Sequence, residues 1–201
     1  MSAFLITAAL SYFLGSVPFG YILVRAVHGQ DIRQTGSGNI GATNVSRTSP
    51  ILGIVTLILD ALKGLASVFI ARTMFAGKPD LMGAAALFAI IGHMFPVWLK
   101  FRGGKGVATA LGSFILLAPT TIAILLVIFL CAFLIFRYVS LASIIAVALF
   151  PLLAWILEAR GAAPLWLIFM TAASLLIIIK HHENIRRLLA HTERRYQWGG
   201  R

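Results

Sequence analysis

Acidic residues are scarce in this 201-residue sequence. Six carboxylates stand against 17 Lys and Arg residues, the formal net charge is +11, and charged residues make up only 11% of the chain. At 60% hydrophobic residues, the composition excludes an ordinary soluble domain, which is roughly half apolar, so lipid must solvate much of the surface. In a membrane protein, basic residues mainly set orientation and contact anionic headgroups, so we exclude nucleic acid as a partner.

Cysteine is also nearly absent. Cys131 is the single cysteine, so neither a disulfide framework nor a cysteine-based metal site is available. Because the sequence shows no convincing repeat and no Pro- or Ser-rich linker, we predict one domain over residues 1–201. The apolar residues 3–14 follow no Lys or Arg and precede no clear cleavage site, which favours a retained helix over a signal peptide.

Long apolar runs occupy most of the chain. A helix needs about 20 apolar residues to cross the hydrocarbon of a bilayer. Runs near this length predict an all-α polytopic membrane protein, a compact bundle of about seven transmembrane helices. The fourth run is short for a crossing, so five, six or seven full spans stay open. The expected helices cover residues 3–25, 51–75, 81–99, 105–118, 120–137, 139–157 and 164–180.

The distribution of basic residues predicts an orientation. Seven crossings would leave three cations on one side, Lys63 inside a helix, and thirteen cations on the other side. By the positive-inside rule, the second side is cytoplasmic, so we expect the N-terminus outside and the C-terminus in the cytoplasm. The thirteen are Arg25, Arg33, Arg47, Lys100, Arg102, Lys105, Arg137, Lys180, Arg186, Arg187, Arg194, Arg195 and Arg201.

Three polar, glycine-rich segments fall on that same side, and the first covers residues 35–47. Its glycines let the backbone approach an anion, its Ser, Thr and Asn side chains add neutral donors, and Arg47 can grip phosphate oxygens in a bidentate fork. Taken alone, the segment is equally compatible with a flexible connector. Its candidate ligands are Ser37, Gly38, Asn39, Gly41, Thr43, Asn44 and Arg47.

The second segment covers residues 92–109 and contains a Gly-Gly-Lys-Gly core. Amides at Gly103, Gly104 and Gly106 could bind phosphate oxygens while Lys105 supplies the charge. The Walker spacing is missing, which disfavours an NTPase. Lys100 and Arg102 fit interfacial charges whose stems lie along apolar surface. His93 is a candidate proton-transfer or substrate-binding group, with a hydrogen-bonded structural histidine as the more conservative interpretation.

The third segment, residues 181–188, continues directly from the last apolar run. On a helix, His181 and Asn184 share one face, which we expect to point inward. The outer, solvated face should carry His182, Arg186 and Arg187 as a basic juxtamembrane patch. Adjacent histidines on a helix point about 100° apart, so we reject a metal site here.

Asp60 and Lys63 lie within the second apolar run, three residues apart. This spacing allows them to pair on one helical face. Ionisable residues inside a membrane often mark a functional pathway. A mutual ion pair that braces the bundle is an equally good interpretation, and we assign them to structural support.

Taken together, the three segments resemble the motifs of the bacterial acyl-phosphate:glycerol-3-phosphate acyltransferase family of integral membrane proteins. The similarity covers residues 37–47, 92–109 and 181–188, and extends to residues 15–20 and to Asp60 with Lys63-Gly64. One departure is His182, where a basic residue such as Arg is commoner in the family. The family forms a membrane bundle with its motifs on the cytoplasmic side.

The resemblance implies transfer of a fatty acyl group from acyl phosphate to the 1-hydroxyl of glycerol 3-phosphate, which releases lysophosphatidic acid and phosphate in phospholipid biosynthesis. It implies no cofactor and no metal. The expected partners are the two substrates, the lipid bilayer and, as a candidate, the enzyme that makes the acyl phosphate. The expected location is the bacterial cytoplasmic (inner) membrane, with several membrane passes and a cytoplasmic active site.

The expected mechanism relies on positioning. Arg47 and Lys105 would hold the phosphates, Ser37 and glycine amides would polarise the acyl phosphate, and His181 with Asn184 would position the acceptor. No His-x4-Asp dyad is present. An acyl phosphate tolerates this absence because it is an activated anhydride, and a covalent acyl-Ser37 intermediate is disfavoured. A transporter built on broken helices is the main alternative, and a purely structural scaffold is the second.

Overall fold

All regular elements in residues 1–196, which the computed structural model describes, are helices. Arg201, one of the thirteen cations counted above, lies outside the described residues. The α-helices are α1 (Ser2–Gly15), α2 (Phe19–His28), α3 (Ala42–Thr48), α4 (Pro50–Met74), α5 (Pro79–Met94), α6 (Val107–Phe114), α7 (Pro119–Phe136), α8 (Val139–Leu157), α9 (Leu165–Lys180) and α10 (His182–Leu189). Two 3₁₀ turns are η1 (Ile32–Gln34) and η2 (Val97–Leu99).

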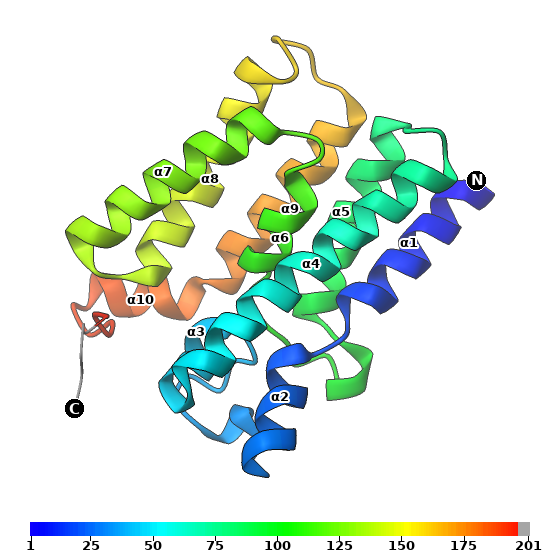
Figure 1. The fold of residues 1–201 in the computed structure, drawn as a ribbon. Helices are drawn as coiled ribbons and strands as arrows, with labels where there is room; N and C mark the ends of the chain where they lie inside the picture. The colour runs from blue at the N-terminus through cyan, green and yellow to red at the C-terminus, as the bar shows by residue number, and fades with distance from the viewer. Residues whose placement is uncertain (197–201) are drawn as a thin grey trace.

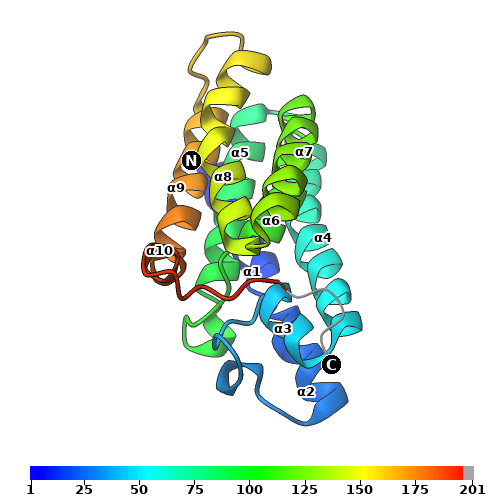
Figure 2. The same cartoon turned by 90° about the vertical axis from the view of Figure 1, so that its left-hand side faces the viewer.

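The long helices run side by side along one bundle axis (Figure 1). One end of the bundle gathers α2, α3, α10 and the loop between α5 and α6, as the second view also shows (Figure 2). The start of α1 and the turns that join α4 to α5 and α8 to α9 lie at the opposite end (Figure 1). All three polar segments therefore lie toward the same end of the molecule.

The helix lengths support five or six continuous membrane spans, within the five to seven that the sequence left open. Five helical segments are long and apolar enough to cross a bilayer, with α1 and α2 counted together, and the bent pair α9 and α10 could supply a sixth. The expected helix over 105–118 is reduced to α6, whose 8 residues extend about 12 Å against a hydrocarbon core of about 30 Å. Gly106 in the left-handed conformation and the turn before Pro119 delimit it.

The outer surface of the bundle is apolar, as a lipid solvent requires. On α7, Val127, Leu134 and Ile135 are 60%, 62% and 72% exposed. A soluble protein rarely exposes so continuous an apolar face. The chain is thus built as a multi-pass membrane protein.

Small residues let the inner helices approach closely around α5, where Ala84, Ala85, Ala86 and Ala89 are fully buried. A β-carbon at Gly15 would lie 2.1 Å from the Ala89 carbonyl oxygen, so α1 and α5 meet nearly backbone to backbone. Because lipid supplies little hydrophobic drive between helices, such close van der Waals contact is a main source of helix association.

The expected ion pair in α4 is confirmed. Lys63 Nζ lies 2.7 Å from Asp60 Oδ1, and both side chains are almost fully buried. Lys63 Nζ also donates to the Val17 carbonyl, at 2.7 Å. That carbonyl is available because the expected helix over 3–25 breaks before Pro18, which lacks an N–H and disfavours helix in the residue before it.

A close crossing of α4 and α6 generates a stability prediction. A β-carbon at Gly112 would lie 1.8 Å from the carbonyl oxygen of Ala61, so Gly112→Ala must push the helices apart. We expect a loss of about 1 to 3 kcal/mol, typical of overpacking. Thermal unfolding of the detergent-solubilised protein measures it. Ala123→Leu, on the exposed face of α7, is the control and should leave the unfolding temperature unchanged; equal stability of both variants would contradict the prediction.

Candidate functional site

Asn44 organises the first polar segment. Its side chain is 2% exposed, and its Nδ2 donates to the carbonyls of Ile32, Thr35 and Asn39 at 3.1, 3.1 and 2.8 Å. Its Oδ1 accepts from the Ser37 amide at 2.8 Å. The side chain expected to bind substrate is therefore committed to shaping the loop.

Two glycines complete this loop in the left-handed conformation, Gly36 with φ 58° and Gly38 with φ 69°. A β-carbon at Gly36 would lie 2.2 Å from Asn44 Oδ1, so this position also requires a glycine for space. Asn39 Oδ1 accepts from the Gly41 amide at 2.8 Å and fixes the entry into α3. In the loop folded this way, Ser37 and Thr43 are exposed.

Arg47, in the last turn of α3, brings a guanidinium beside this loop. The β-carbon position of Gly36 lies 3.4 Å from Arg47 Nη1. Burial lowers the pKa of Arg47, and the positive charges of Arg194 and Arg187 lower it further, while Glu193 partly offsets them. The guanidinium therefore lies in a cationic surrounding that an anion would stabilise.

The second segment folds back onto the end of α5. The Gly103 amide donates to the Met94 carbonyl at 3.1 Å, and the Gly104 amide donates to the His93 carbonyl at 3.0 Å. Gly106, with φ 87°, then starts α6. The Gly103 and Gly104 amides were expected to bind phosphate oxygens, but both are occupied by carbonyls of α5. Lys105 is presented between two buried glycines, Gly104 and Gly106.

Lys105 connects the second segment with the third. Its Nζ donates to Asn184 Oδ1, and Asn184 Nδ2 donates to Glu193 Oε1 at 2.6 Å. Burial lowers the pKa of Lys105 to about 8, and the nearby charges of Arg187 and Arg47 lower it while Glu193 and Glu183 raise it. Charges from the first and third predicted segments, and from Glu193 beyond them, therefore act on this amine.

Glu193 is a member of this network that the sequence interpretation missed. Its Oε1 also accepts from Ser140 Oγ at 2.7 Å, and its Oε2 accepts from Arg187 Nε at 2.6 Å. Burial opposes its ionisation, but these bonds and the bond from Asn184 keep its pKa below the usual range. A lone carboxylate among the cations of residues 184–201 was the available signal.

The expected faces of α10 are confirmed except at Arg187. His181 and Asn184 are 2% and 5% exposed, whereas His182 and Arg186 are exposed. The assignment of Arg187 to the outer basic patch is wrong, because Arg187 turns toward Glu193 and pairs with it. The chain after α10 turns back toward the helix and brings the Glu193 carboxylate to Arg187.

His181 has a fixed tautomer. Its Nδ1 lies 2.7 Å from the Ile177 carbonyl oxygen. Since a carbonyl can only accept, Nδ1 carries a proton, and Nε2 of the neutral ring is free to accept one. Burial lowers the pKa of His181 to about 4, so Nε2 is a weak base that can accept a hydrogen bond from a hydroxyl.

His93 lies apart from the surface residues. It is 3% exposed at the end of α5, and its Nδ1 lies 3.5 Å from Asp60 Oδ1. The structure therefore places this predicted ligand beneath the glycine loop, next to the buried ion pair.

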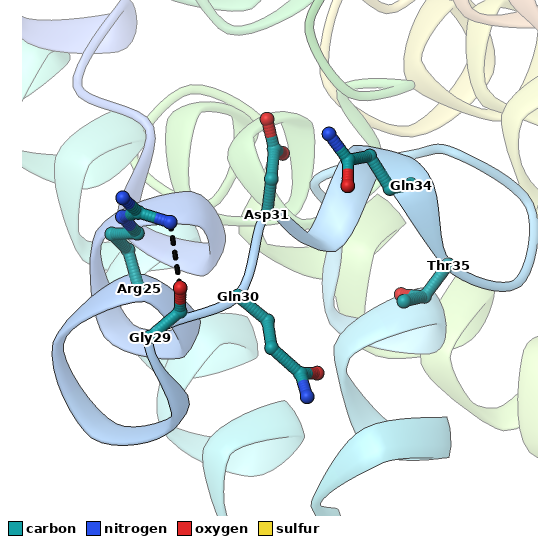
Figure 3. A pocket seen from close by; sticks show the side chains of 6 residues that line it. All are labelled: Arg25, Gly29, Gln30, Asp31, Gln34 and Thr35. Atoms are coloured by element: carbon teal, nitrogen blue, oxygen red, sulfur yellow. Dashed lines mark hydrogen bonds between the residues drawn. The ribbon is translucent and has the colours of Figure 1, made fainter.

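A separate polar hollow of about 440 Å³ borders the turn after α2. Figure 3 shows its lining, in which Arg25 Nη1 donates to the Gly29 carbonyl at 2.6 Å. None of the predicted site residues lines it. Its lining residues are Arg25, Gly29, Gln30, Asp31, Gln34 and Thr35.

Two cations, neutral amide and hydroxyl donors and glycine backbone meet at one end of an apolar bundle. Such a set binds oxyanions, because charge-assisted bonds to phosphate are strong where water is scarce. Glu193, the carboxylate bonded into this network, is held by three donors and cannot readily serve as a base. Fold and site together define a helical membrane protein with a phosphate-type anion site.

Comparison with known proteins identifies the family. The family model described as glycerol-3-phosphate acyltransferase matches residues 5–191. The glycerol-3-phosphate acyltransferase of Geotalea daltonii is 49% identical over 185 residues, which are 91% of this chain and 92% of the relative. That of Syntrophotalea carbinolica is 45% identical over 98% of this chain and all of the relative. The chain belongs to the glycerol-3-phosphate acyltransferase family.

A solved structure is similar over nearly the whole chain. The glycerol 3-phosphate form of PlsY (YgiH), an integral membrane glycerol 3-phosphate acyltransferase, superposes with a TM-score of 0.89 at 38% identity, covering 98% of this chain and 96% of that chain. Its lysophosphatidic acid form gives a TM-score of 0.84 at 37% identity over the same shares. The bundle is therefore the architecture of this family.

The lowered Lys105 pKa predicts a pH dependence. Above pH 8 the amine loses its proton and can no longer pair with a phosphate, so the affinity for glycerol 3-phosphate should fall by up to about tenfold per pH unit. Calorimetric titration between about pH 7 and pH 9.5 measures this. Lys105→Arg, whose guanidinium stays charged in that range, should bind with little pH dependence. An equal decline in both proteins would assign the effect to another group.

Proposed function

We propose that this protein transfers a fatty acyl group from acyl phosphate to the 1-hydroxyl of glycerol 3-phosphate and releases lysophosphatidic acid and phosphate. The cluster of Arg47, Lys105 and Asn184 carries the proposal, because both substrates bring a phosphate to it. Support comes from the family membership and from the two liganded forms of the similar structure. Access to lipid around the bundle suits a substrate with a fatty tail.

In this proposal, Arg47 and Lys105 hold the two phosphate groups. The exposed Ser37 hydroxyl polarises the acyl carbonyl, and His181 with Asn184 positions the acceptor. Asn39, Gly41 and Asn44 shape the loop that carries Ser37, while the exposed Thr43 offers a further hydroxyl.

The reaction itself is a direct displacement. The acceptor hydroxyl oxygen bonds to the carbonyl carbon, the bond from that carbon to the bridging phosphate oxygen breaks, and phosphate leaves. The hydroxyl proton passes either to His181 Nε2 or to a substrate phosphate. Because a mixed anhydride is already activated, orientation and charge stabilisation suffice, and neither a carboxylate-backed base nor an acyl-Ser37 intermediate is required.

The site should face the cytoplasm of a bacterial inner membrane, with the N-terminus outside. Thirteen cations on the expected inner side against three on the other support this orientation. The opposite placement of the start of α1 and of α10 in the bundle agrees with it (Figure 1). The enzyme that makes the acyl phosphate is then a candidate partner on the same face.

The donor can be tested with purified protein. Palmitoyl phosphate and glycerol 3-phosphate should give lysophosphatidic acid and inorganic phosphate in equal amounts with no acyl-CoA present. Palmitoyl-CoA is the matched control and should give no product, since its thioester offers no phosphate next to the carbonyl. A strict requirement for acyl-CoA or an acyl carrier protein would refute the donor assignment.

Removing either cation should slow the reaction strongly. We expect Arg47→Ala and Lys105→Ala each to lower kcat/KM by about 10² to 10³, the usual cost of one electrostatic donor. Arg102→Ala, which removes an exposed cation from the loop of Lys105, should stay within about threefold of wild type. Activities of Arg47→Ala and Lys105→Ala within a few fold of wild type would show that these residues do not hold the phosphates.

A further inference from the structure

His93 lies directly under the glycine loop that carries Lys105. A β-carbon at Gly104 would lie 1.9 Å from His93 Nε2, 2.8 Å from Cε1 and 2.9 Å from Cδ2, so the edge of the ring supports the Gly104 backbone. The Gly104 amide also donates to the His93 carbonyl, at 3.0 Å. One residue of α5 therefore contacts this glycine through both its backbone and its side chain.

The other edge of the ring faces the buried ion pair of α4. His93 Nδ1 lies 3.5 Å from Asp60 Oδ1, and the same oxygen lies 2.7 Å from Lys63 Nζ. Lys63 is held in turn by the Val17 carbonyl. The imidazole thus lies between a buried ion pair and the loop, so a movement away from Gly104 would press it against Asp60.

The loop is also fixed on the far side of Lys105. The β-carbon position of Gly106 lies 2.9 Å from Met94 Cε and 3.0 Å from Ile90 Cγ2, both on α5. Lys105 therefore projects between two glycines that both pack against the end of α5. Because Lys105 follows Gly104 directly, the distance of the Gly104 backbone from α5 affects where the Lys105 side chain points, which is toward Asn184 Oδ1.

We propose that His93 is a positioning residue that aims Lys105 at the substrate phosphate by supporting Gly104, with Asp60 and Lys63 holding the ring in place. This role replaces the expectation that His93 contacts the substrate itself. It rests on the proposed function, since phosphate binding by Lys105 is what the loop position controls. A displacement of about 1 Å at a binding group can cost about 10²-fold in rate, so a support of this kind has a measurable effect.

A pair of size-changing substitutions tests the support. Gly104→Ala alone should raise the KM for glycerol 3-phosphate by about tenfold or more, because its methyl group must displace the ring or the loop. His93→Ala alone should raise KM by a smaller factor. In the double variant the methyl group occupies part of the vacated space, so KM should return to the value of His93→Ala or below.

Gly103→Ala is the matched control. A β-carbon there would meet the His93 carbonyl oxygen at 2.1 Å, Pro96 Cδ at 2.4 Å and the Met94 carbonyl oxygen at 2.8 Å, and His93→Ala removes none of these atoms. Adding His93→Ala to it should therefore give no relief, and the two effects on KM should multiply. If His93→Ala lowered the KM of both Gly103→Ala and Gly104→Ala, the loop would be loosened in general and the specific contact would be refuted. If the KM increases of His93→Ala and Gly104→Ala simply multiplied in the double variant, the proposal would be refuted as well.

A second series remains informative if Gly104→Ala fails to fold. His93→Phe keeps an aromatic ring under Gly104 but loses the contact to Asp60, and His93→Gln keeps a polar group but loses the ring. Support by the ring therefore predicts a lower KM for Phe than for Gln. The reverse order would show that His93 contacts the substrate and would refute the proposal. Calorimetric binding of glycerol 3-phosphate gives the same ranking without a donor. A wild-type protein that binds but does not turn over acyl phosphate would then refute the proposed function alone.

Discussion

A buried ion pair in α4 is the constraint on which the rest of the architecture depends. Asp60 and Lys63 lie within a membrane span, where an uncompensated charge costs several kcal/mol, so each needs a partner at close range. Lys63 takes its second partner from the Val17 carbonyl, which the break between α1 and α2 leaves available. Asp60 faces His93 on α5. Three segments of the chain are therefore fixed relative to one another by one polar cluster.

The anion site, by contrast, carries an excess of positive charge that its own residues do not neutralise. Burial lowers the pKa values of Arg47 and Lys105, and nearby arginines lower them further, Arg194 and Arg187 acting on Arg47 and Arg187 and Arg47 acting on Lys105. Glu193 offsets part of this repulsion, yet its hydrogen bonds keep it from competing for the space of a ligand. The cluster therefore favours an incoming anion without offering it a carboxylate.

Apolar runs, spacing and charge were sufficient to predict most of the helices, the Asp60 and Lys63 pair, and the inward face of His181 and Asn184. These features depend on one helix at a time, so periodicity reveals them. The role of Glu193 depends on a chain reversal after α10 that brings it 2.6 Å from Asn184 Nδ2, and no spacing rule contains that information. The shortness of α6 likewise depends on where a turn forms before Pro119.

Glycine-rich segments near phosphate sites are usually interpreted as backbone that touches the ligand, but these glycines serve more than one purpose. Gly36 leaves room for the Asn44 side chain, Gly104 lies on the His93 ring, and Gly106 has the positive φ that starts α6. Each makes space for a group that shapes the loop from the protein side. The spacing of glycines in the sequence therefore encodes the support of the loop as much as the recognition of phosphate, and the two functions separate only when the atoms beneath each glycine are known.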